Sequence, residues 1–205
     1  MKLVKKYWPS FLFLISFLIL LSFVIVNKTL QIDTIIYNFI HTYMINDKST
    51  IFLKIITNFG GVSAILVIAI FLTVILKEKK YKLGVLLNLL LITGMNQLLK
   101  NIIRRPRPTT LRLINETGYS FPSGHSMVGL AFYGFLIYII YKKVNNKYLR
   151  NISIILLSFL ILLIGFSRIY LGVHYFSDVL GGFLFSLVYL PFFISIFKVG
   201  SNNEK

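Results

Sequence analysis

The sequence predicts an all-α, polytopic membrane protein, with six transmembrane helices forming one domain over residues 1–205. Hydrophobic residues make up 57% of the chain and charged residues 14%, whereas soluble domains have roughly 45–50% and about 25%. The apolar residues also gather into long runs separated by Lys- and Arg-rich breaks. Because about 20 apolar residues suffice to cross a bilayer, six such runs take up most of the chain.

The first run could be a signal peptide or an uncleaved span, since basic residues precede it. Bulky residues at 23–26 stand where a small-residue cleavage site would be expected, which favours an uncleaved span. Segment 27–50 alternates apolar and polar residues and is expected to lie along the membrane surface. Amides within the third run are expected to form hydrogen bonds between helices. The expected spans cover residues 11–26, 62–76, 83–99, 123–141, 152–166 and 177–197.

The net charge of +16 raises the question of a nucleic-acid partner. Nucleic-acid binding would require a basic patch on a folded soluble face, but the basic residues here stand at the ends of apolar runs, so no nucleic-acid partner is expected. Lys and Arg number 13 on the side of the N-terminus and nine on the other. The protein is expected in the plasma membrane, and the positive-inside rule predicts that both termini lie in the cytoplasm. Segments 100–121 and 167–175 are accordingly expected to face outward.

Three polar clusters fall on that outer face, at residues 100–108, 121–125 and 167–178. Lys100, Arg107 and Arg168 supply three cations, and guanidinium and ammonium groups suit the oxygens of a phosphate. Ser123 and Gly124 open a helix, where free backbone N–H groups and the helix dipole favour an anion. Together these residues predict a phosphate-binding site.

Two histidines and a carboxylate accompany the cations. His174 and Asp178 are four residues apart and share a helix face, so the carboxylate can hold one imidazole nitrogen protonated and leave the other as a nucleophile. His125 is then available as the general acid. Taken singly, the cations could bind lipid head groups and the histidines could be structural. Their joint occurrence on one face favours catalysis.

Few groups could hold a metal. The chain has no cysteine, which excludes thiolate ligands, disulfides and a Cys nucleophile. Of the six acidic residues, two are expected near the site, Glu116 and Asp178. A two-metal phosphatase needs more carboxylate oxygens than these, so neither a metal nor another cofactor is expected.

The three clusters resemble the signatures of the type 2 phosphatidic acid phosphatase superfamily, K-x6-RP, PSGH and SR-x5-H-x3-D. They stand here as Lys100 to Arg107-Pro108, as residues 122–125, and as Ser167-Arg168 to His174 to Asp178. The resemblance extends to the order of the motifs among the six spans. The chain looks most like the short bacterial enzymes that dephosphorylate phosphatidylglycerophosphate or undecaprenyl diphosphate.

The resemblance implies a metal-independent, two-step hydrolysis of a membrane lipid phosphate, without an obligate protein partner. His174 would form a phosphohistidine with Asp178 orienting it, and His125 would protonate the leaving group and then activate water. The phosphate would be bound by Lys100, Arg107, Ser123, Gly124 and Arg168. A second Arg-Pro pair, Arg105-Pro106, leaves open whether Arg104 or Arg105 assists a second phosphate.

Three alternatives remain at the level of sequence. A broad-specificity phosphatidic acid or lipid phosphate phosphatase would use the same residues. A lipid transporter or flippase would also have six spans, but neither an inverted repeat nor a mid-membrane charge points to one. Vanadium haloperoxidases share the motifs in a soluble fold, which six lipid-length runs argue against.

Overall fold

Eight helices and no β-strand occur within residues 2–199, the part of the backbone that the computed structural model describes; its side chains are described over residues 7–196. The predicted all-α class is therefore confirmed. The helices are α1 (Lys2–Asn27), α2 (Gln31–Tyr43), α3 (Asp47–Asn58), α4 (Val62–Ile75), α5 (Lys79–Ile103), α6 (Gly124–Lys143), α7 (Lys147–Tyr170) and α8 (Phe176–Val199).

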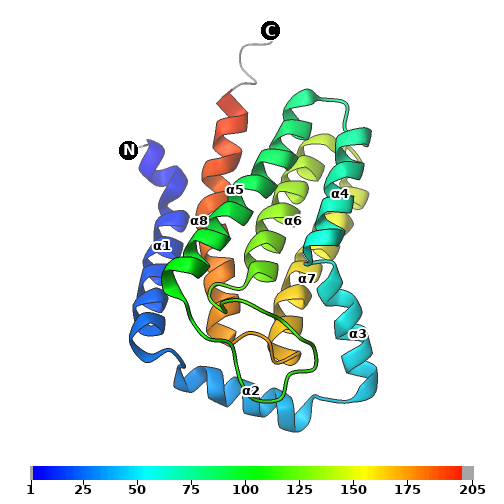
Figure 1. Ribbon diagram of the computed structural model, residues 1–205. Coiled ribbons are helices and arrows are strands. Elements are labelled where there is room, and N and C mark those ends of the chain that lie inside the picture. Colours follow the sequence, from blue (N-terminus) through cyan, green and yellow to red (C-terminus); the bar gives the residue numbers. More distant parts are fainter. Residues whose placement is uncertain (1, 200–205) are drawn as a thin grey trace.

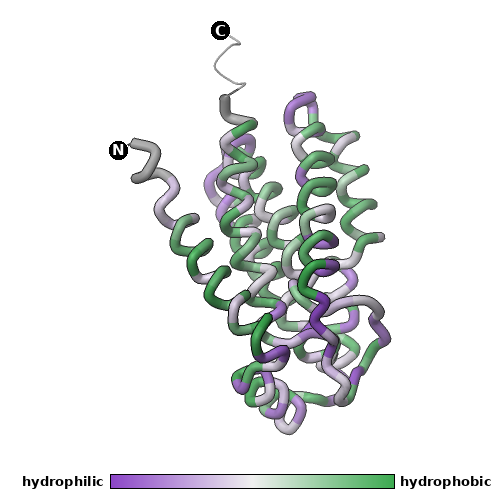
Figure 2. Tube along the Cα trace, turned by 60° about the vertical axis from the view of Figure 1, so that its left-hand side comes forward, coloured by the Kyte–Doolittle hydropathy of each residue, from purple (hydrophilic) through white to green (hydrophobic). Residues whose placement is uncertain are grey.

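The long helices form a bundle around α6, which packs against α5, α7 and α8. Helix α1 packs on α8, and α4 packs on α5. Helix α2 crosses one end of the bundle. The first described turn of α1 and the last described turn of α8 lie at the other end (Figure 1). Hydropathic colouring shows apolar residues along the length of the helices and polar residues at both ends of the bundle, including the end near α2 (Figure 2). That polar end holds the loop between α5 and α6.

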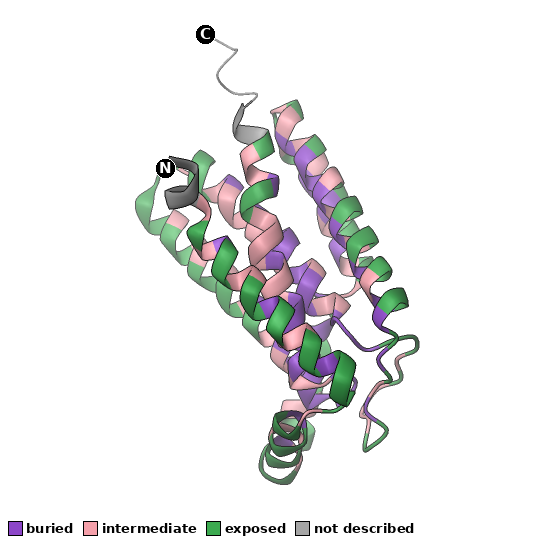
Figure 3. Cartoon of the chain, turned by 90° about the vertical axis from the view of Figure 1, so that its left-hand side faces the viewer, coloured by how far each residue is buried: buried purple, intermediate pink, exposed green. Residues whose placement is uncertain are grey.

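The outer faces of the helices are apolar, as a bilayer requires. Exposed residues cover the outside of the bundle and buried residues lie between the helices (Figure 3). Within the part of the chain that the structure describes, five helices are each long and apolar enough to cross a membrane, namely α1, α5, α6, α7 and α8. A sixth span results if α3 and α4 are counted together. The chain is thus a multi-pass membrane protein.

The second expected span has different bounds from those predicted. Helix α4 has 14 residues, about 21 Å at 1.5 Å per residue, which is shorter than the ~30 Å hydrocarbon core. Helix α3 precedes it at an angle of 48°, so residues 47–50 begin a broken span, while α2 alone crosses the end of the bundle. Gly60 permits the close packing at the break, because a Cβ there would lie 2.5 Å from Ile164 and 3.0 Å from His125.

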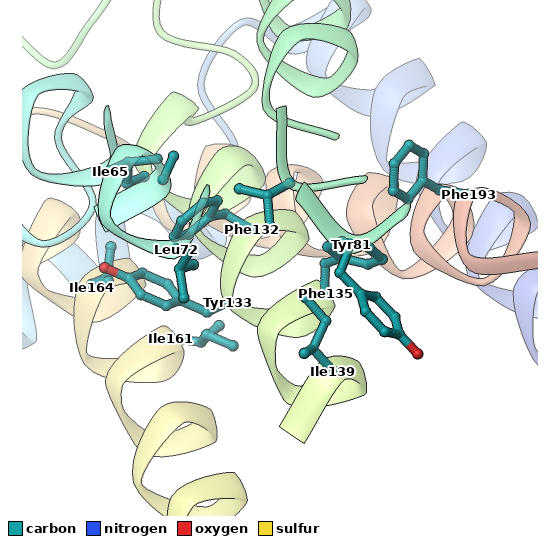
Figure 4. Packing of buried hydrophobic residues seen from close by; sticks show 12 residues of the cluster. Ile65, Leu72, Tyr81, Phe132, Tyr133, Phe135, Ile139, Ile161, Ile164 and Phe193 are labelled. Carbon is teal, nitrogen blue, oxygen red and sulfur yellow. The ribbon is translucent and has the colours of Figure 1, made fainter. Parts of the chain in front are cut away.

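The main hydrophobic cluster surrounds α6 (Figure 4). Phe132 and Phe135 pack there with Ile65 of α4 and Ile164 of α7. A polar group within this cluster is hydrogen-bonded to the backbone: the Tyr133 hydroxyl donates to the carbonyl of Phe59 at 2.7 Å.

The hydrogen bonds between helices that were expected of the amides in the third run are confirmed at Asn88, and Asn96 bonds to the segment just before α6. Asn88 donates to the carbonyl of Ala131 at 2.8 Å, and Asn96 donates to that of Pro122 at 3.2 Å. These bonds tie α5 to α6 and to the segment that begins it.

Candidate active site

A cavity of about 740 Å³ lies between α4 and α5 and extends to the polar end of the bundle. Its wall has two chemically different parts. The apolar part contains Val62, Ile65, Leu66, Leu86, Leu89 and Leu90, and the polar part contains Lys100, Arg107, Glu116, Gly124, His125 and His174. Five of the residues predicted from the sequence therefore meet in one cavity, although they come from two helices and two loops.

The contacts of His174 define the roles of its two ring nitrogens. Nδ1 lies 3.4 Å from Oδ2 of Asp178 and 3.2 Å from the hydroxyl of Ser120. Nε2 lies 3.0 Å from Nη1 of Arg107. Because a guanidinium has donors and no acceptor, Nε2 must accept this bond through its lone pair. The proton of the neutral ring then belongs on Nδ1, facing Asp178, and the lone pair of Nε2 faces the cavity.

The carboxylate of Asp178 is fully buried and is held at both oxygens. Oδ2 accepts hydrogen bonds from the Ser120 hydroxyl at 2.5 Å and from the backbone N–H of Tyr175 at 2.8 Å. Oδ1 accepts a hydrogen bond from Nη1 of Arg105 at 2.6 Å. The predicted pairing of Asp178 with His174 is present, with an orientation fixed by three further donors.

The three predicted cations converge from different elements. Lys100, in the last turn of α5, donates to the carbonyl of Tyr119. Arg107 donates to the carbonyl of Val173 at 2.9 Å and to carbonyls of the loop. Arg168 lies behind the cavity wall, is almost fully buried, and donates to the hydroxyl of Thr57 at 2.8 Å.

Glu116 occupies the space between two of these cations. Its carboxylate pairs with Arg168 and lies 3.9 Å from Nη2 of Arg107. Glu116 also lines the cavity. Arg168, which lies behind the wall, is therefore connected to the cavity through its ion pair with Glu116. The point where these arginines converge already accommodates an anionic group of the protein itself.

The N-terminus of α6 contributes differently from the prediction. Gly124 and His125 line the cavity, and a Cβ on Gly124 would lie 3.1 Å from Oδ1 of Asn96. Ser123, at the N-cap position, is fully buried, and its hydroxyl accepts a hydrogen bond from Ser126 at 3.0 Å. Its backbone N–H donates to the carbonyl of Asp178 at 3.0 Å. Ser123 therefore connects α6 to α8 from behind the wall.

The structure bears on one open question about a charged residue and corrects one expectation. Arg105, considered as an aid to a second phosphate, is fully buried in ion pairs with Asp33 and Asp178. Asp33, expected on a membrane-surface segment away from the site, is joined through Arg105 to Asp178.

Neither the role of Asp33 nor that of Ser120 was predicted from the sequence. For Asp33, the small number of acidic residues was a usable signal. In a chain with six acidic residues and 22 basic ones, each carboxylate in an apolar segment is a candidate partner for a buried cation.

Burial determines the protonation state of the candidate nucleophile. It lowers the pKa of His174 to about 3, against the hydrogen bond and charge of Asp178, which raise it, while Arg107 and Arg168 lower it further. An ordinary histidine has a pKa near 6.5. Because the pKa is lowered, the neutral form persists at every pH above that value, including neutral pH. The ring is therefore neutral at physiological pH.

The sequence is similar to those of known proteins. The family model of the PAP2 superfamily matches residues 63–200. Phosphatidylglycerophosphatase B of Bacillus subtilis is 42% identical over 102 residues, 49% of each chain. Dolichyldiphosphatase 1 of Homo sapiens is 34% identical over 148 residues, 65% of this chain and 61% of that one. The matched region thus spans about half to three-fifths of these relatives.

Two solved structures are similar over most of the chain. The crystal structure of a transmembrane PAP2-type phosphatidylglycerolphosphate phosphatase from Bacillus subtilis superposes with a TM-score of 0.83 at 27% identity, covering 96% of this chain and 97% of that one. LpxE of Aquifex aeolicus superposes with a TM-score of 0.66 at 23% identity, covering 83% and 98%. The second likeness concerns the fold alone.

The protonation state of His174 can be tested directly by NMR on histidine-labelled protein in detergent. The chain has three histidines, so His41→Gln and His174→Ala variants assign their signals. We expect the His174 ring signals to stay constant between about pH 5 and 8, where an unperturbed histidine titrates. A chemical-shift change centred near pH 6.5 would contradict the assignment.

Proposed function

The chain belongs to the PAP2 superfamily, and on this premise we propose that it is a metal-independent membrane lipid phosphatase. Its proposed reaction removes the terminal phosphate of phosphatidylglycerophosphate or undecaprenyl diphosphate at the outer face of the plasma membrane, through a phosphohistidine. Similarity to phosphatidylglycerophosphatase B supports the first substrate, and similarity to dolichyldiphosphatase supports a polyprenyl diphosphate. The family favours a phosphatase over the transporter alternative.

The observation that carries this proposal is the two-part cavity. Its polar end combines cations with two histidines, and its apolar part lies between α4 and α5. Residues of that part are also open to the surroundings of the protein: Val62 is 73% exposed and Leu90 is 69% exposed. A lipid phosphate has the same two-part chemistry, with a charged group attached to an apolar tail.

In the first step, Nε2 of His174 attacks the phosphorus atom. A P–N bond forms as the bond from phosphorus to the lipid oxygen breaks, and His125 gives its proton to that oxygen. The proton on Nδ1 stays toward Asp178, whose charge stabilises the imidazolium that develops. Arg107, which donates to Nε2 in this structure, must turn its N–H toward a phosphate oxygen as the lone pair of Nε2 is used.

In the second step, His125 accepts a proton from water as the water oxygen attacks the phosphohistidine. The P–N bond breaks, and inorganic phosphate is released. In both steps negative charge grows on the phosphate oxygens, which Lys100 and Arg107 stabilise from the cavity wall. Arg168 joins them when the phosphate displaces the carboxylate of Glu116, with which the phosphate competes for the same guanidinium groups.

The state of the carboxylates supports metal independence. Asp178 is engaged by Arg105 and three other donors, and Glu116 is paired with two arginines. A divalent ion would have to compete with these guanidinium groups for oxygen ligands. The arginines supply the positive charge that a metal would otherwise supply.

Purified protein should release inorganic phosphate from lipid phosphates in detergent micelles that contain excess chelator. We expect vanadate to inhibit, since it mimics five-coordinate phosphorus, and we expect higher rates on phosphatidylglycerophosphate and undecaprenyl diphosphate than on phosphatidic acid. Release of phosphate is measured for the three lipids side by side. Loss of activity on chelation that Mg²⁺ restores would refute the metal-independent mechanism.

The two histidines should differ in their kinetic effects. His174→Ala should abolish turnover, since no phosphoenzyme can form. His125→Ala should slow cleavage of the lipid roughly 10²–10⁴-fold, because a lipid alkoxide needs a proton, and should retain more activity on nitrophenyl phosphate, whose leaving group does not. Rapid quenching with labelled substrate should detect phosphoenzyme in His125→Ala; labelled enzyme in His174→Ala would reverse the roles.

The orientation can be tested in intact cells because the chain has no cysteine. A cysteine replacing Asn115, exposed in the loop that carries Glu116, should react with an impermeant thiol reagent. A cysteine replacing Asn145, exposed between α6 and α7 at the opposite end of the bundle, should react only after the cells are opened. The opposite pattern would place the site in the cytoplasm.

A further inference from the structure

Arg105 is fully buried, and every nitrogen of its guanidinium has a partner. Nη1 donates to Oδ1 of Asp178 at 2.6 Å, and Nη2 donates to Oδ2 of Asp33 at 2.7 Å. Nε donates to the carbonyl of Lys28 at 2.5 Å, and the guanidinium carbon lies 4.3 Å from the ring centroid of Tyr175. Arg105 thus bridges two buried carboxylates from behind the cavity wall.

Asp33 extends this bridge to the backbone of α8. It lies in the first turn of α2 and is 1% exposed. Oδ1 accepts the backbone N–H of Ser177 at 2.8 Å, and Oδ2 accepts the Ser177 hydroxyl at 2.7 Å. Since Ser177 directly precedes Asp178, Asp33 holds the backbone that carries the catalytic carboxylate. The helix that crosses the end of the bundle (Figure 1) is thereby connected to the reaction centre.

We propose that Asp33 and Arg105 are positioning residues that together hold the Asp178 carboxylate with Oδ2 toward Nδ1 of His174. The inference rests on the proposed function, because it assigns both residues a part in that reaction. Neither residue lines the cavity, so each acts through Asp178 and not through contact with substrate. This role is different from that of Arg107, which lines the cavity and contacts His174.

The physical reason is the sharing of one guanidinium between two carboxylates. With Asp33 in place, Arg105 is held from two sides and cannot move onto Asp178 alone. With an amide at position 33, Arg105 would be attracted to Asp178 alone. Because attraction between charges is poorly screened in a buried site, the Asp178 carboxylate would be drawn toward Arg105 and its hydrogen bond with His174 would weaken. The amide N–H2 would also present a donor where Arg105 and Ser177 need an acceptor.

Asp33→Asn should lower kcat for a lipid phosphate by about 10- to 100-fold, as is typical when a group supporting a reacting side chain is lost. The value of KM should change by less than about 3-fold, because Lys100 and Arg107 keep their places. The matched control is Asp47→Asn, which replaces an exposed carboxylate in the first turn of α3 and should leave kcat unchanged. Equal effects of the two variants would overturn the proposal.

A double-mutant cycle separates positioning from a general structural effect. If Asp33 acts through Asp178, Asp33→Asn should cause little further loss in the Asp178→Asn background. Phosphoenzyme formation from nitrophenyl phosphate in a single turnover gives the residual rates. Full additivity of the two losses would show that Asp33 acts independently of Asp178 and would overturn the proposal.

Failure of the inference can be distinguished from failure of the proposed function. A wild-type protein that releases no phosphate from lipids would refute the function. An active wild type with unchanged kcat in folded Asp33→Asn would refute the inference and leave the function standing. If Asp33→Asn does not fold, Ser177→Ala is measured instead. This substitution removes the hydroxyl that accepts a hydrogen bond from Arg105 and donates one to Asp33, and it changes no charge. A several-fold loss of kcat at constant KM is expected, and an unchanged kcat would refute the inference.

Discussion

The two ion pairs of Arg105 join three parts of the chain that are far apart in sequence: the loop after α5, the surface helix α2 and the start of α8. The backbone of the same residue closes the loop, because its carbonyl accepts the N–H of Ser120 at 2.8 Å. Ser120 is thereby brought to Asp178. Removing one member of a buried ion pair leaves an uncompensated charge, so the positions of His174 and of the loop between α5 and α6 depend on this one guanidinium.

Much of the fold follows from the sequence, since the length of an apolar run is a local property. The broken span α3–α4 is the exception, because Asp47, Lys48 and Lys54 lower the hydropathy of its first half. Asp33 could not be placed either. Its partners Arg105 and Ser177 lie 72 and 144 residues away, and no periodicity of α2 reveals contacts over such a separation.

For the candidate site too, part of the arrangement could be predicted from the sequence and part could not. The order of the spans predicted that the three clusters meet on one face, and five of the predicted residues do line one cavity. Spacing does not determine which side chains reach the cavity wall. Ser123 and Arg168 occupy motif positions but lie behind the cavity wall. Glu116 belongs to no motif but is part of the wall. Local packing of the loop decides these placements.

The cavity between α4 and α5 has a consequence for the kinetics of a lipid substrate. A tail held among exposed apolar residues of two spans can approach by diffusion within the plane of the bilayer, without extraction into water. The relevant concentration is then the number of substrate molecules per unit of membrane area. Adding inert lipid to vesicles should slow the reaction even when the amount of substrate per volume is constant, and the membrane composition itself becomes a determinant of the rate.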